Sequence, residues 1–254
     1  MPLVDRAPLS AEQLQAYQEQ GYLIVRGLLD EPALQAIRSV HQGAVAAACE
    51  ALASGDSPAN ADDWDRGPDG TLEVRKVGAP FTRFPEFREV VASDAVLDIV
   101  AALIGPEVYL HSSKLMCKPA RVGRRKPWHQ DWAYWDDMDP RQLTMWCAVD
   151  PATRQNGCIE LIPGSHRWGL IQHEQLDDWQ IRESRVEGAD VRFAEMDPGD
   201  VLFMDVLTLH ASGPNQSSEA RLAALVNFDG TPRRSDQHSP YGSTVPLRAR
   251  AATD

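Results

Sequence analysis

The chain has 254 residues, enough for one large domain or two small ones with a sizeable buried core. Its hydrophobic fraction of 43% and charged fraction of 24% are typical of a soluble globular protein. The formal net charge of −12 at pH 7 argues against nucleic acid as a partner, because phosphate backbones bind basic surfaces.

From the sequence we expect neither an export signal nor a membrane-spanning segment. The opening stretch MPLVDRAPLS lacks an apolar segment of signal-peptide length, and no later apolar run could span a bilayer. We therefore expect a cytoplasmic protein without a membrane partner. The four cysteines form no CxxC pair, so we expect reduced thiols rather than a zinc site. The sequence indicates no particular oligomeric state.

The first part of the chain, residues 1–105, is predicted to be mainly helical with one strand. The segment SAEQ at Ser10 is a capping box that begins a helix ending at Gly21. The apolar run YLIVRGLL then predicts a buried strand, and Asp30 caps a second helix. A third helix is expected between the Ser93 cap and Gly105.

Residues 55–80 are polar, have little periodicity and contain several Gly and Pro residues. We expect one long loop there. Loops of this length in compact domains are commonly lids or binding segments, so residues 55–80 are the candidate lid over a pocket mouth.

From residue 106 to residue 230, short apolar segments alternate with turn signals. Successive strands of this kind predict a sandwich or barrel rather than βαβ units. We therefore expect a single domain over residues 1–254, with helical support from residues 1–105 and a barrel core from residues 106–230.

The segment KPWHQDWAYWDD, residues 126–137, places His129 and Asp131 two residues apart among aromatic side chains. In an extended strand residues i and i+2 point to the same face, so an imidazole nitrogen and a carboxylate oxygen can converge. One more His would complete a facial triad that leaves coordination positions open. An HxD pair alone is a weak signal, because such pairs arise often by chance.

A second pattern strengthens the first. The stretch GDVLFMDVLTLHASG predicts a turn and then a strand ending in His210, and Arg221 opens the next apolar strand. If these strands are antiparallel neighbours, both residues lie at the same end of the barrel. A guanidinium there can hold a carboxylate whose other end chelates the metal. Singly, each residue also fits a plain structural role, whereas the combination favours a metal site with an anion clamp.

In order and content, these motifs resemble the phytanoyl-CoA dioxygenase family of Fe(II)/2-oxoglutarate-dependent oxygenases. The resemblance covers roughly residues 10–230 and is carried by KPWHQDWAYW, NGCIELIPGSH and PGDVLFMDVLTLHASGPNQSSEARLAALVNF. It implies a mainly β fold with flanking α-helices, the double-stranded β-helix or jelly-roll, cupin-like barrel.

The resemblance also implies roles for individual residues. His129, Asp131 and His210 would be the metal ligands for Fe(II), and Arg221 would bind the distal carboxylate of 2-oxoglutarate, with O2 as the second cosubstrate. Further residues expected at the cosubstrate are Lys118, Ser212 and Trp146.

The substrate pocket is expected beside the metal, where large aromatic side chains can form apolar walls. The residues expected to line it are Trp132, Tyr134, Trp135 and His111. Packing between the barrel and the N-terminal helices is an alternative role for the aromatic residues. Three other histidines lack a supporting pattern and are expected to be solvated: His41, His173 and His238.

The resemblance implies a dioxygenase that hydroxylates or otherwise oxidises a small-molecule substrate, releasing succinate and CO2, with secondary metabolism as the expected setting. Halogenating relatives replace the metal-binding acid with Ala or Gly; because Asp131 is present here, hydroxylation is favoured. One alternative is a non-catalytic metal-binding cupin-like sensor or binding protein, which would need neither Arg221 nor Lys118. Another is a cupin-type enzyme that uses a different metal without 2-oxoglutarate, which would need additional His ligands.

Overall fold

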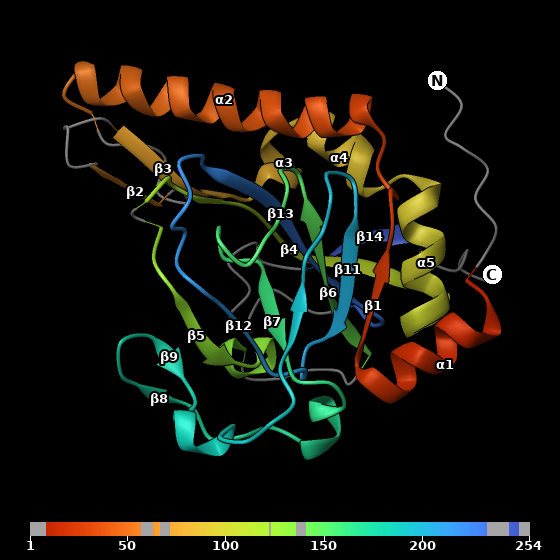
Figure 1. Cartoon of the computed structure of the whole chain (residues 1–254). Coiled ribbons are helices and arrows are strands. Elements are labelled where there is room, and N and C mark those ends of the chain that lie inside the picture. The colour runs from red at the N-terminus through yellow and green to blue at the C-terminus, as the bar shows by residue number, and fades with distance from the viewer. Residues whose placement is uncertain are drawn as a thin grey trace.

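The computed structural model describes residues 9–56, 63–66, 72–121, 123–135, 141–232 and 244–248. Within these ranges the chain forms two antiparallel sheets that enclose a barrel, with helices packed on the outer face of the larger sheet (Figure 1). This is the predicted double-stranded β-helix, mainly β with flanking α-helices. No helix in these ranges has the length and apolar character needed to cross a membrane.

The larger sheet has eight strands in the described part of the chain, and seven of them follow one path. In spatial order these are β1 (Tyr22–Val25), β11 (Val201–Asp205), β6 (Gln142–Ala148), β13 (Arg221–Asp229), β4 (Val108–Lys118), β3 (Leu72–Gly78) and β2 (Asp63–Arg66). The eighth strand, β14 (Val245–Arg248), pairs with β4.

The smaller sheet runs in the order β10 (Arg192–Ala194), β7 (Ile159–Leu161), β12 (His210–Ser212) and β5 (Lys126–His129). A separate hairpin is formed by β8 (Glu174–Gln175) and β9 (Trp179–Gln180). Short 3-10 helices punctuate the connections: η1 (Asp131–Tyr134), η2 (Ser165–Trp168) and η3 (Glu183–Arg185).

The helices are α1 (Ala11–Gln20), α2 (Glu31–Ala53), α3 (Pro80–Arg83), α4 (Pro85–Val91) and α5 (Asp94–Ile104). The predicted capping box is present at Ser10, and Asp30 accepts the N–H of Ala33 to cap α2. Gly21 ends α1 with φ of 78°, a left-handed conformation that favours glycine. The short helices α3 and α4 were not predicted, and each has proline in its first turn, where a missing N–H costs nothing.

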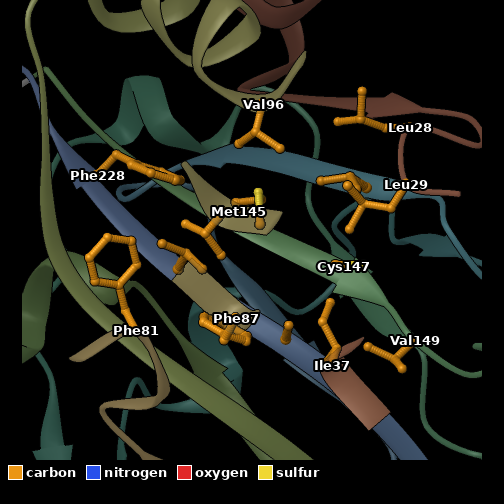
Figure 2. Packing of buried hydrophobic residues seen from close by; sticks show 14 of the residues in the cluster. Leu28, Leu29, Ile37, Phe81, Phe87, Val96, Met145, Cys147, Val149 and Phe228 are labelled. Carbon is orange, nitrogen blue, oxygen red and sulfur yellow. The ribbon is translucent and has the colours of Figure 1, made fainter. Parts of the chain in front are cut away.

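The main core lies between the helices and the outer face of the larger sheet. Figure 2 shows Ile37 of α2 and Phe87 of α4 packed near Met145, Cys147 and Phe228 of the sheet, all essentially excluded from solvent. Because side chains alternate along a strand, the residues between these face the barrel interior. On β6 they include Thr144 and Trp146, whose positions matter for the site below.

The loop predicted for residues 55–80 needs correction. Asp63–Arg66 and Leu72–Gly78 are antiparallel strands, and Leu72–Gly78 joins the edge of the larger sheet through β4. The three charged residues between and beside them hid the buried Val74 and Val77, which anchor this strand. Residues 57–62 and 67–71 lie outside the described residues, and the lid role stays a prediction.

The predicted boundary between helical support and barrel core also needs refinement. The strand β1, which lies within residues 1–105, pairs with β11 and is part of the larger sheet. It is shorter than the predicted run YLIVRGLL, because Gly27 adopts a positive φ of 53° and the chain turns toward α2. The single-domain organisation stays a prediction.

Candidate metal centre and cosubstrate pocket

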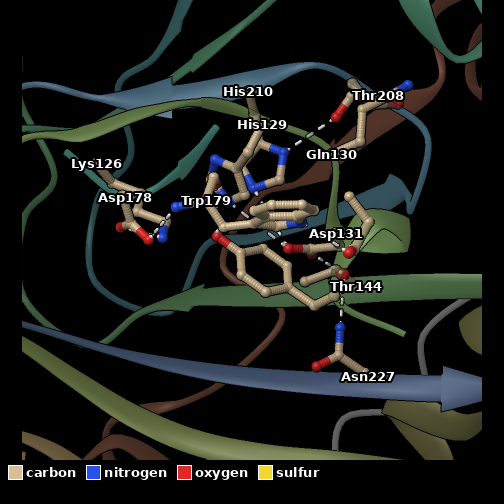
Figure 3. Close-up of polar contacts among 12 residues, drawn as sticks. Lys126, His129, Gln130, Asp131, Thr144, Asp178, Trp179, Thr208, His210 and Asn227 are labelled. Carbon is tan, nitrogen blue, oxygen red and sulfur yellow. Dashed lines mark hydrogen bonds and ion pairs between the residues drawn. The ribbon is translucent and has the colours of Figure 1, made fainter. Parts of the chain in front are cut away.

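His129, Asp131 and His210 come together inside the barrel, from three different elements. His129 ends β5 and pairs in register with His210 at the start of β12, while Asp131 opens η1. Asp131 Oδ1 lies 3.8 Å from His129 Nε2 and 3.7 Å from His210 Nε2. One ligand atom of each residue lies within 4.8 Å of the other two. Figure 3 shows the two imidazole rings side by side above the carboxylate.

The backbone stays extended at Gln130, so the side chains of His129 and Asp131 point to the same side of the chain. Gln130 has φ of −117° and ψ of 135°, and the chain turns into a 3-10 helix only at Asp131. Gln130 points away and is held by hydrogen bonds. Its side chain donates to the carbonyls of Gly169 and Leu207 and accepts from the N–H of Ile171. Its own N–H donates to Nε2 of His173 at 3.0 Å.

His173 was therefore predicted wrongly. It is 7% exposed and supports the metal loop instead of facing solvent, and His41 is half-buried as well. The sequence gives no sign of this, because His173 reaches Gln130 from a separate irregular segment. His238 lies outside the described residues.

Both histidines are held in the tautomer that leaves Nε2 available. Nδ1 of His129 lies 2.8 Å from the Pro127 carbonyl, and Nδ1 of His210 lies 3.0 Å from the Thr208 carbonyl. A carbonyl only accepts, so each Nδ1 carries the hydrogen and each Nε2 keeps its lone pair. Burial, with His210 and Lys126 nearby, lowers the pKa of His129 well below its usual value, which keeps that ring neutral.

The carboxylate of Asp131 is oriented by a row of polar side chains across the larger sheet. Thr144 donates to Asp131 Oδ2 at 2.5 Å, Asn227 donates to the Thr144 hydroxyl at 2.7 Å, and Ser112 donates to Asn227 Oδ1 at 2.6 Å. Thr144, Asn227 and Ser112 are register partners on β6, β13 and β4, and each is at most 3% exposed. The row occupies Oδ2 and leaves Oδ1 facing the two histidines (Figure 3).

Two cations, the buried Arg221 and the half-buried Lys118, lie side by side on neighbouring strands of the larger sheet. Arg221, at the start of β13, is the register partner of Lys118, at the end of β4. Arg221 is 2% exposed, donates to the Gly157 carbonyl at 2.8 Å and lies 5.0 Å from the centre of the Trp146 ring. Its Nε is buried and has no hydrogen-bond partner within the described ranges.

Lys118 likewise has only neutral partners. Its ammonium donates to the carbonyls of Arg124 at 2.9 Å, Ser212 at 3.5 Å and Gly213. Among the residues that the structure describes, no carboxylate forms an ion pair with Lys118 or Arg221. Burial, aided by the charge of Arg221, lowers the pKa of Lys118 to about 7, and burial lowers the pKa of Arg221 to about 10. An anion bound between Lys118 and Arg221 would offset the free-energy cost of burying each positive charge.

Gly157 is required for this arrangement. It has φ of +79°, and a Cβ there would lie 2.3 Å from the Gly213 carbonyl oxygen. Only glycine lets the two loops approach so closely while the Gly157 carbonyl reaches Arg221.

The family model for phytanoyl-CoA dioxygenase (PhyH) matches residues 17–223. This range includes the three candidate metal ligands, Lys118 and Arg221, and it ends before Asn227 of the polar row. The chain belongs to the phytanoyl-CoA dioxygenase family. Members of this family, this chain included, are Fe(II)- and 2-oxoglutarate-dependent oxygenases that also use O2.

Individual relatives agree with this assignment. A probable alpha-ketoglutarate-dependent hypophosphite dioxygenase from Stutzerimonas stutzeri is 27% identical over 86% of this chain and 78% of the relative. The ectoine dioxygenase of Sphingopyxis alaskensis is 26% identical over 94% of this chain and 81% of the relative. The crystal structure of EctD from S. alaskensis with bound Fe superposes with a TM-score of 0.70 and 25% identity, covering 90% of this chain and 79% of that one.

Of the four predicted pocket residues of this PhyH-family chain, three make ring contacts that link them to the metal centre. Tyr134 meets the His129 ring edge-on at a centroid distance of 5.8 Å, and Trp135 meets His111 at 4.8 Å. His111 is 3% exposed and lies 3.2 Å from an Asp229 carboxylate oxygen. Trp132 has no ring contact within the described ranges, although its backbone donates to Val206. Three of the four thus form a connected chain of rings from the metal centre to β4.

Proposed function

We propose that this chain hydroxylates a small molecule, with His129, Asp131 and His210 as the ligands of Fe(II). Two neutral imidazoles and one carboxylate on one side of a metal form the facial triad of non-haem Fe(II) oxygenases, and the donor set here fits that ion. The hydrogen bonds to both Nδ1 atoms and to Asp131 Oδ2 orient all three groups in advance.

We assign the distal carboxylate of 2-oxoglutarate to Arg221 and Lys118. The observation that carries the proposal is this pair of cations, the buried Arg221 and the half-buried Lys118, which lack a carboxylate partner in the described part and lie in the same barrel as the triad. A metal-binding sensor would need no such pair. Trp146 would pack against the cosubstrate and the guanidinium, and Ser212, two residues beyond His210 on β12, would add a hydroxyl.

When bound, Fe(II) and 2-oxoglutarate activate O2 and oxidise the substrate, with succinate and CO2 as the other products. The residues of the chain orient these partners and keep water out. The barrel interior around Trp146 is lined with buried apolar side chains, including Leu202, Met204 and Ala223. Such a dry interior protects a reactive centre from side reactions.

The presence of Asp131 favours hydroxylation over halogenation. Its carboxylate would take the third protein position at the metal, which a halide would otherwise need, and the Thr144 hydroxyl orients it for that role. Relatives named for ectoine and hypophosphite suggest a free small molecule as the substrate. A cytoplasmic location and the absence of nucleic-acid and membrane partners stay predictions.

The proposal is tested by uncoupled turnover. The purified protein should release succinate from 2-oxoglutarate only with both Fe(II) and O2, and Zn(II) should not replace iron. The His210→Ala variant should lose this activity, whereas His166→Gln should retain it because His166 contacts the Gln18 carbonyl in α1 instead of the centre. Succinate release that continues without iron, or that survives His210→Ala, would contradict the assignment.

A further inference from the structure

Lys114 places a positive charge on the metal-facing side of β4. Ser112, two residues earlier, belongs to the polar row that holds Asp131, so alternation puts Lys114 on the same face. The residues on either side face the other way: Ser113 accepts the N–H of Phe81, and Leu115 is 0% exposed in the outer core. The side chain of Lys114 therefore lies on the inner side of the larger sheet.

No anionic group pairs with Lys114 within the described ranges. The side chain is half-buried and makes no hydrogen bond or ion pair there. Burial lowers the pKa of Lys114; the negative charge of Asp131 opposes this shift, and the positive charges of Lys76 and Lys126 add to it. Within the described ranges Asp131 is the carboxylate whose charge acts on Lys114, and it would be committed to the metal once iron binds.

Two neighbouring cations, Lys126 and Lys118, already have another partner or an assigned ligand. Lys126 is paired with Asp178 at 2.5 Å and lies over the Tyr134 ring. Lys118 is four residues farther along β4, about 13 Å away at ~3.3 Å per residue, beside Arg221. In the proposed function, Arg221 and Lys118 bind the distal carboxylate of 2-oxoglutarate, and the other end of 2-oxoglutarate binds the metal. Lys114 remains for a third anionic group.

We infer that Lys114 binds an anionic group of the substrate, so that the enzyme acts on a small molecule carrying a carboxylate or a similar oxyanion. This inference rests on the proposed function. The ammonium would hold the charged end of the substrate on β4 while the Leu225 side chain, on the neighbouring strand, supplies an apolar contact. The group to be oxidised would then be positioned at the metal by an anchor that takes no part in the oxidation.

The test uses matched pairs of short carboxylic acids and their primary amides. Each is titrated calorimetrically, without O2, into protein loaded with Fe(II) and 2-oxoglutarate. In the wild type at least one acid should bind at least about tenfold more tightly than its amide, through a charge-assisted hydrogen bond. Lys114→Met should abolish this preference, Lys114→Arg should retain it, and Lys126→Met should leave it in place, because Lys126 already has a carboxylate partner.

The visible band of the Fe(II)–2-oxoglutarate complex separates the possible failures. If the wild type forms no band, the proposed function itself fails. If Lys114→Met weakens 2-oxoglutarate binding by about tenfold or more, the anion at Lys114 belongs to the cosubstrate and the inference is overturned. It is also overturned if the band is normal but no acid is preferred over its amide, or if the preference survives Lys114→Met.

Discussion

The substitution Thr144→Val tests how the carboxylate ligand is held. Valine matches the shape of threonine but lacks the hydroxyl that donates to Asp131 at 2.5 Å and accepts from Asn227 at 2.7 Å. The change removes one hydrogen bond to a charged acceptor and leaves the buried amide of Asn227 without its partner. Together these losses cost about 3 kcal/mol of unfolding free energy.

For a chain of this size that cost corresponds to a decrease in Tm of roughly 6–12 °C. Loss of a group that orients a metal ligand typically weakens metal binding by about 10–100-fold. The assays are thermal unfolding of the metal-free protein and an anaerobic Fe(II) titration. Both should change in Thr144→Val.

Ser113→Ala is the matched control. Ser113 also has a buried hydroxyl on the larger sheet, but it accepts the N–H of Phe81 on the helical side and does not touch the metal centre. Its loss should lower Tm while Fe(II) affinity stays unchanged. If Thr144→Val binds iron as tightly as the wild type, or if Ser113→Ala weakens iron as much, the polar row does not hold the ligand.

Three further predictions concern the metal and the cosubstrate. His129→Ala, Asp131→Ala and His210→Ala should each lose stoichiometric iron, measured by elemental analysis, and full iron content in any of them would refute its role. Arg221→Met should weaken 2-oxoglutarate binding about 100-fold with Fe(II) affinity unchanged, because the distal carboxylate of the bound cosubstrate loses its cationic partner. Arg182→Met, which changes an exposed arginine paired with Glu174, should have no effect. Because the pKa of Lys118 is about 7, the affinity for 2-oxoglutarate should fall as pH rises. Below pH 7 the lysine is already a cation, whereas above pH 7 it must take up a proton when 2-oxoglutarate binds. The affinity should then decrease by up to about tenfold per pH unit. Calorimetry across this range should show the decline in the wild type and a flat profile in Lys118→Met, and a flat wild-type profile would refute it.

The sequence predicts best what depends on local spacing. His129 and Asp131 are two residues apart across an extended residue, so their convergence follows from strand geometry. Helix ends are also local, as the capping box at Ser10 shows. These features need no knowledge of distant contacts. By contrast, the expected pairing of the strands at His210 and Arg221 was wrong. The strand predicted to end at His210 ends at Asp205, and His210 and Arg221 open β12 and β13, which belong to different sheets and do not pair.

Features that depend on strand register cannot be predicted this way. Ser112, Thr144 and Asn227 are far apart in sequence and form one row only because β4, β13 and β6 pair as they do. A polar residue at an inward position of an otherwise apolar strand was the available signal. The charged strand Leu72–Gly78 escaped for another reason, since its buried valines are not spaced in strict alternation.

The central claim is that iron and 2-oxoglutarate bind together in this barrel. The most direct measurement is an anaerobic titration of the metal-free protein with Fe(II) and then 2-oxoglutarate, recording the visible charge-transfer band. A band that saturates at one 2-oxoglutarate per iron, is absent in His210→Ala and needs far more cosubstrate in Arg221→Met is the predicted result. Tight iron binding without any band would contradict the claim and favour a metal-binding protein without this chemistry.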